Sequence, residues 1–171
     1  VTDTWISFLL EQDLAALTVH GRTAKEMSKV PAHWDEIGKV VQIRNRMSIP
    51  TKIIGNGDVA DAKDAIKKHH EYGVDGVMIG RGVFNTLWAF DRSPNPHVAT
   101  TEELLGIMEK HIRLFDEEWG DRKNYALLKK FFKIYINGFP GAADARVRFM
   151  ETQTPVQALN LLKELSGNLI T

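Results

Sequence analysis

Three short polar motifs recur in the first half of the chain, and they constrain its fold more than any other feature. They are His20-Gly21-Arg22-Thr23, Gly55-Asn56-Gly57-Asp58 and Gly80-Arg81-Gly82. Each follows a short apolar run typical of a buried strand and precedes a segment with helical spacing of apolar residues. Because the carboxyl ends of parallel strands meet at one rim, the pattern predicts a ligand site of the kind that (β/α) barrels carry there.

The elements around these motifs alternate as βα units do. We expect strands over 15–19, 52–54 and 76–79, and helices around 5–10, 34–41 and 62–66, the last ended by Gly73 in a left-handed cap. A complete eight-unit barrel needs roughly 250 residues, whereas this chain has 171 and begins at Val1. We therefore interpret residues 1–92 as a partial TIM barrel of about three units, in the carboxyl-terminal fragment of a longer α/β protein.

A proline pair interrupts this alternation. Ser93-Pro94-Asn95-Pro96-His97 disfavours both helix and central strand, so we predict a linker over 93–100 and a small helical bundle over 101–171. Its first helix begins with the capping box at Thr100. Further helices are expected over 127–135, over 145–150, and from Pro155 to a stop at Gly167.

Composition excludes several classes of site. The 22 basic and 22 acidic side chains cancel, and the absence of cysteine excludes disulfides, thiolate metal sites and a catalytic thiol within these residues. No apolar run approaches the ~20 residues of a membrane span, and no signal-peptide pattern is visible. We expect a cytoplasmic protein without a metal site.

Taken singly, each motif has a plainer explanation. Gly80-Arg81-Gly82 suits a phosphate loop and a tight strand–helix turn equally well. Asn56 and Asp58 could simply form a turn and cap the next helix. His20 could be structural, and Arg22 could pair with an acidic surface group.

The tail is locally basic. Between Lys110 and Arg148 nine basic residues face five acidic ones. The region includes Lys129, Lys130, Lys133 and Arg146, and the three lysines fall largely opposite the apolar stripe of their expected helix. Such a face is either ordinary solvated surface or a contact for nucleic-acid phosphates.

The motifs together resemble the tRNA-dihydrouridine synthases. The resemblance rests on 17–23, on 54–58 and on 75–82, in that order and spacing, and on Gly138-Phe139-Pro140-Gly141-Ala142 with Arg146 in the tail. It implies an FMN-dependent barrel that reduces uridine in tRNA to dihydrouridine, with NADPH as reductant, and strands that are the sixth to eighth of that barrel.

The resemblance also implies roles for residues. His20 would contact the flavin, Asn56, Gly57 and Asp58 would line its ribityl–phosphate region, and Gly80 and Arg81 would bind its phosphate. The expected tRNA contacts are Arg22, Lys129, Lys130, Lys133 and Arg146.

The chain departs from the family's pattern in what it lacks. The cysteine that protonates the uracil and the flavin-contacting lysine are both expected upstream of Val1, so no catalytic residue is expected in this chain and the fragment alone should be inactive. Residues 24–30 lack the family's usual aromatic residue and glycine. Two alternatives remain: another FMN-dependent oxidoreductase acting on a small pyrimidine or enone, and a non-catalytic RNA-binding module. An open sheet edge would pair with the missing barrel half or with a second copy.

Overall fold

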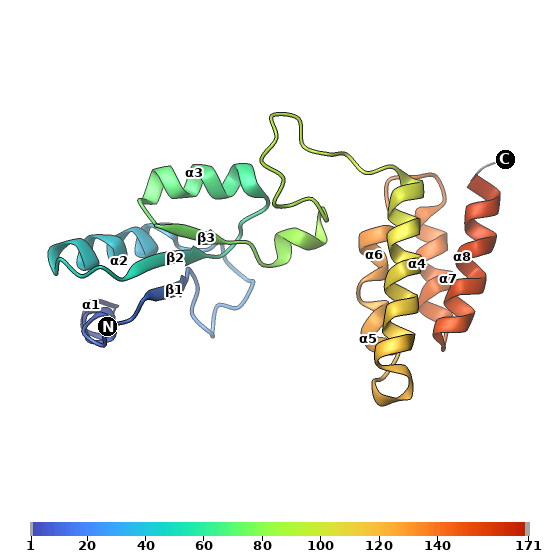
Figure 1. Ribbon diagram of the computed structural model, residues 1–171, viewed down its shortest axis with the longest axis horizontal. Coiled ribbons are helices and arrows are strands. Elements are labelled where there is room, and N and C mark those ends of the chain that lie inside the picture. Colours follow the sequence, from blue (N-terminus) through green and yellow to red (C-terminus); the bar gives the residue numbers. More distant parts are fainter. Residues whose placement is uncertain (1, 170–171) are drawn as a thin grey trace. The chain divides into compact units, whose positions relative to one another are not determined.

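The computed structural model describes residues 2–169, which divide into two compact units, 2–96 and 97–169 (Figure 1). The first unit alternates helices and strands, as the sequence predicts. Its elements are α1 (Thr2–Leu10), β1 (Ala16–His20), α2 (Trp34–Arg46), β2 (Lys52–Asn56), α3 (Ala62–Tyr72), β3 (Gly76–Met78) and the short 3-10 turn η1 (Arg81–Phe84).

The three strands form a parallel sheet in the order β1-β2-β3. In the register of this sheet Thr18 pairs with Ile54, and His20 pairs with Asn56, which in turn pairs with Met78. The parallel sheet predicted from the motifs is therefore confirmed, and within the described sheet β1 and β3 are the edge strands.

Helices cover one face of this sheet. The core beneath them contains Ile37 and Val40 of α2, Ile53 of β2 and Val74, all less than 2 % exposed. Leu17, Val19 and Val77 pack against this core from the outer strands. Because side chains alternate along a strand, the residues between them face the other way. We call that side the open face; it carries Thr18, His20, Ile54, Asn56 and Met78, none of which is fully buried.

Helix α2 packs tightly on the sheet at Gly55. A Cβ atom there would lie 2.5 Å from Cζ3 and 2.7 Å from Cη2 of the Trp34 ring. The indole Nε1 of this buried tryptophan donates a hydrogen bond to the Gly57 carbonyl at 2.8 Å. Trp34 therefore fastens α2 to the end of β2, directly beneath the second motif.

In the second unit, every regular element within the described residues is a helix. They are α4 (Thr101–Glu118), the 3-10 turn η2 (Gly120–Arg122), α5 (Ala126–Lys129), α6 (Phe132–Tyr135), α7 (Ala142–Glu151) and α8 (Pro155–Leu169). The long α4 packs on α8 and α6, and the rings of Phe132 and Phe149 meet edge to face 5.5 Å apart in the core. Thr100 forms both bonds of the predicted capping box.

Two expectations for this unit are wrong. The single helix expected over 127–135 is two short helices separated at Lys130-Phe131. The last helix continues through Gly167 to Leu169, because a glycine ends a helix only where the chain turns left-handed. By contrast, Gly73 does adopt that conformation, with φ 69°.

Candidate functional site

The three motifs meet at the carboxyl end of the sheet. His20, Asn56 and Met78 occupy one row of the register. The Gly21 backbone N–H donates to the Asn56 carbonyl at 2.8 Å, and Asn56 Nδ2 donates to the Met78 carbonyl at 2.8 Å. Hydrogen bonds thus hold the ends of β1, β2 and β3 together.

The backbone conformation at position 57 requires a glycine. Its φ of 129° lies in a region that side chains rarely adopt, and a Cβ atom there would lie 2.7 Å from that of Ala32. The next residue, Asp58, has φ 49° and so also turns left-handed. This turn points the Asp58 carboxylate back toward the loop that follows β1.

The Asp58 carboxylate contacts residues of the first and third motifs and of the loop between β1 and α2. Its Oδ2 accepts hydrogen bonds from Arg22 and from the Ala32 backbone N–H, and its Oδ1 lies 3.5 Å from the Arg81 guanidinium. The bond from Arg22, aided by Ala32 and Arg81 and opposed by partial burial, holds the pKa of the Asp58 carboxyl below its usual range. The expectation that Asp58 caps the following helix is wrong, because Asp61 caps α3.

Arg22 lies inside the protein rather than at its surface. Its side chain is only 5 % exposed, its Nε donates to the Val30 carbonyl at 2.5 Å, and its terminal NH2 donates to Asp58. In this conformation the guanidinium holds the loop over 23–32 to the end of β2. The contact with RNA expected for Arg22 would require that loop to move.

The same loop is tied at two further points. Glu26 accepts hydrogen bonds from Thr23 and from His33, and these lower the pKa of the Glu26 carboxyl to about 2, the Thr23 backbone bond contributing most. Ser28 Oγ accepts from Arg81 at 2.8 Å. The first and third motifs are therefore joined through the loop.

A hollow of about 460 Å³ lies between this loop and the end of β3, and we call it the rim hollow. It is lined by His20, Arg22, Thr23, Ala24, Met27, Ser28 and Arg81. Arg81 is 64 % exposed and keeps guanidinium donors beyond those given to Ser28 and Asp58. The rim hollow thus combines an exposed cation with a histidine, a donor set suited to an anionic ligand.

The predicted site residues are not all equivalent in this geometry. Of the predicted cofactor residues, His20 and Arg81 line the rim hollow itself, whereas Asn56, Gly57 and Asp58 shape the strand ends beside it. Gly80 is exposed immediately before η1. Ser28 and Trp34 were not predicted; helical spacing marked Trp34 only as apolar, and no sequence signal reveals its bond to Gly57.

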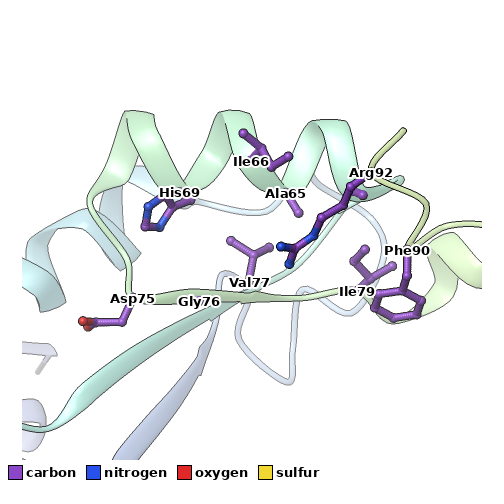
Figure 2. Close-up of a pocket in the computed structure, with 10 residues that line it drawn as sticks. Ala65, Ile66, His69, Asp75, Gly76, Val77, Ile79, Phe90 and Arg92 are labelled. Atoms are coloured by element: carbon purple, nitrogen blue, oxygen red, sulfur yellow. The ribbon is translucent and has the colours of Figure 1, made fainter. Parts of the chain in front are cut away.

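A second hollow lies at the sheet edge, between α3 and β3 (Figure 2). Its volume is about 360 Å³. Figure 2 shows Ala65 and Ile66 of α3 above Val77 and Ile79, with Phe90 and Arg92 at one end. At the other end Asp75 already accepts bonds from the Ile53 backbone N–H, Arg44 and Lys52. No predicted site residue lines this mostly apolar pocket.

The predicted RNA contacts of the second unit gather along one groove of about 840 Å³, which we call the basic groove. It is lined by Lys129, Lys130, Phe132, Lys133, Ala143, Arg146, Val147, Met150 and Glu151. Lys129 donates to the Met150 carbonyl and Arg146 to the Ile136 carbonyl, each at 2.8 Å. The ammonium groups of Lys130 and Lys133 have no partner among the described residues.

Within residues 2–169, no helix is long and apolar enough to cross a membrane. The same described stretch contains no group of three histidine, aspartate or glutamate side chains placed to hold a metal ion.

Comparison with known proteins places these features in a family. The sequence profile described as "Dihydrouridine synthase (Dus)" matches residues 6–169. A "Probable tRNA-dihydrouridine synthase" of Staphylococcus aureus (strain Mu50) is 40% identical over 166 residues, which cover 96% of this chain and 50% of that protein. "Probable tRNA-dihydrouridine synthase 2" of Bacillus subtilis (strain 168) is 39% identical over 161 residues, covering 94% of this chain and 49% of that protein. The chain spans about half the length of the curated relatives it matches.

Proposed function

The chain belongs to the dihydrouridine synthase family, and on that premise we propose that it is part of an enzyme that reduces uridine in tRNA to 5,6-dihydrouridine. The support is the family match together with the names of relatives about 40% identical over nearly the whole chain. Because the chain spans about half of those relatives, the activity is proposed for the whole protein, in the cytoplasm, and not for these residues alone.

The rim hollow is the proposed place for FMN. When bound, FMN would deliver a hydride to carbon 6 of the uracil and be reduced again by NADPH. Arg81 and the exposed backbone at Gly80 would bind its phosphate, and His20 would face the flavin side. Asn56, Gly57 and Asp58 would line the region between them.

The charges in the rim hollow fit a phosphate group. Asp58 places a carboxylate near Arg81, which by itself would oppose an anion. Arg22 is buried against that carboxylate and neutralises it, so Arg81 keeps its positive charge for a ligand. We therefore assign Arg22 to charge balance and loop anchoring in the structure as it stands, with RNA contact reserved for a conformation in which the loop has moved.

The sheet is the proposed end of a TIM barrel. Its open face would line the barrel interior, and its two edge strands would pair with strands of the other half, or with a second copy when that half is missing. This chain contains no cysteine. The proton that carbon 5 of the uracil receives would therefore come from a cysteine in that other half, and the present residues would bind and orient the cofactor.

The basic groove of the second unit is the proposed contact for tRNA. Its four cations against one carboxylate favour phosphate binding, which supplies most sequence-independent affinity for RNA. A reductase for a small pyrimidine would give this groove no role.

The test uses the complete protein that carries this chain. We expect it to purify with FMN, and its deletion from the host to remove dihydrouridine from a subset of tRNA positions, measured by mass spectrometry of tRNA digests. Arg81→Ala should lower the flavin content at least tenfold, whereas Arg92→Ala, a matched change of an arginine at the sheet edge, should not. A protein that carries no flavin and leaves tRNA dihydrouridine unchanged on deletion would refute the proposal.

A further inference from the structure

We propose that the basic groove holds a single-stranded segment of RNA with one base turned out of its stack against Val147 and Met150. This assignment rests on the proposed function and names the part of the RNA that the groove would take. It follows from the combination of an apolar floor with free cations.

The floor of the groove is apolar and accessible. Val147 and Met150 are 60 % and 54 % exposed, and with Ala143 they form one stripe of α7 at spacings of four and three residues. Beneath them Phe132 is buried in the core, so the floor is anchored. Such a floor contributes nothing to contact with a phosphate, but it matches the apolar face of a base.

The cations of the groove divide into two kinds. Lys129 and Arg146 donate to backbone carbonyls of Met150 and Ile136, and Lys129 also lies 5.5 Å from the centre of the Tyr125 ring. These two side chains therefore hold the segment around α5 and α6 against α7. Lys130 and Lys133 are exposed, and their ammonium groups have no partner in the described part of the chain.

Single-stranded RNA is the ligand that uses both features. Four cations face only the Glu151 carboxylate among the lining residues, so the groove attracts a polyanion. In an A-form duplex the bases are stacked and the protein meets mainly phosphates and 2′-hydroxyls. Only an unstacked base can occupy the apolar floor while its neighbouring phosphates contact Lys130 and Lys133. The groove volume, about 840 Å³, lies in the usual range of roughly 300–1,000 Å³ for ligand sites.

The test separates the charge contribution from that of the apolar floor. Binding of fluorescently labelled tRNA transcript to the complete protein is measured by anisotropy at several salt concentrations. The double variant Lys130→Ala/Lys133→Ala should reduce the slope of log K against log salt by about 1.4, because each single-strand phosphate contact contributes about 0.7. Lys163→Ala, at an exposed position of α8 outside the groove, is the control that should leave the slope unchanged.

The floor is tested without changing charge. Met150→Gln should weaken binding roughly fourfold, the equivalent of about one buried methylene group, with an unchanged salt slope. Val156→Ser, at an equally exposed position of α8 outside the groove, should have no effect. A single-stranded competitor should displace the tRNA from the wild-type protein far better than a duplex of the same sequence.

Each contrary result overturns the assignment. Normal binding by Met150→Gln means that no base lies on the floor, and a duplex that competes equally well means that the groove does not select an unstacked base. If neither groove variant changes the affinity for RNA, the groove does not bind RNA, and an acidic protein partner becomes the alternative ligand. These failures are distinct from failure of the proposed function, which is read from flavin content and tRNA dihydrouridine in the same preparations.

Discussion

Replacing Gly55 by alanine tests how tightly α2 is fastened to the end of β2. The new methyl group would lie 2.5 Å from the Trp34 ring, where ordinary contacts are nearer 3.5–4.0 Å. The indole must therefore shift by about 1 Å, away from the Gly57 carbonyl that its N–H contacts at 2.8 Å.

The expected loss of stability is about 2 kcal/mol. Overpacking of a buried site costs about 1–3 kcal/mol, and a weakened buried hydrogen bond adds about 1 kcal/mol. Removing a glycine from a strand returns about 0.5–1 kcal/mol. A net loss near 2 kcal/mol lowers the ratio of folded to unfolded molecules roughly thirtyfold.

The assay is urea unfolding followed by tryptophan fluorescence, with hydrogen exchange to locate the change. The midpoint should fall by roughly 1 M urea, and exchange should accelerate in peptides of α2 and β2 but not in those of α4 or α8. Gly80→Ala is the matched control, since no atom lies within 4 Å of the added methyl group. A Gly55→Ala protein as stable as Gly80→Ala would refute the close packing of Trp34 on β2.

Three further changes test other parts of the structure. Gly106→Ala, inside α4 with open space around it, should stabilise the second unit by about 1 kcal/mol in thermal unfolding; a lower melting temperature would contradict this. Burial lowers the pKa of His111, which bonds to Tyr135. The unfolded chain therefore binds more protons near the ordinary pKa of 6.5, and stability should fall as the pH drops from 7.5 to 5; His111→Gln should flatten that dependence, and a wild-type curve already flat would refute it. Asp58→Asn should lower the free energy of unfolding by about 1 kcal/mol, because it weakens the bond from Arg22. The loss is no larger because the Asp58 carboxylate is partly exposed and solvent screens its charge. Because Arg22 lowers the Asp58 pKa, the wild type should lose that contribution as the pH falls below 3.8, whereas the variant should not; urea midpoints that converge only at neutral pH would contradict the sign.

The strand–helix alternation was predictable because it depends on local patterns. Apolar runs at 15–19 and 52–54, each followed by a polar tip, predict strands, and the parallel register brings His20 beside Asn56. The burial expected of both strands holds only for β2, which buries Ile53 and Gly55; β1 has no fully buried residue in the described structure. The capping box at Thr100 and the left-handed Gly73 depend only on their immediate neighbours. These features needed no knowledge of distant residues.

The errors arise where distant contacts decide. Asp58 looks like a helix cap because it precedes α3, yet Arg22, 36 residues earlier, holds its carboxylate. The basic segment around Lys130 has helical spacing, but in the structure it forms two short helices, α5 and α6. Phe132, at the start of α6, packs on the distant Phe149 of α7, a contact that the local spacing does not reveal. No period in the sequence distinguishes Lys129, which binds the Met150 carbonyl, from Lys133, which is free to meet a ligand.

On the open face of the sheet, the exposure of a side chain in this chain is a poor guide to the effect of replacing it. Thr18 and Met78 are exposed in the described structure and Ile54 is half-buried, so by exposure alone polar replacements at these positions would be judged mild. In the closed barrel that we propose, the same side chains would become interior packing. Which residues are tolerated at these positions would then depend on side chains of the other half of the barrel. Sequence variation there would reflect how well the two halves fit together, and not the stability of either half alone.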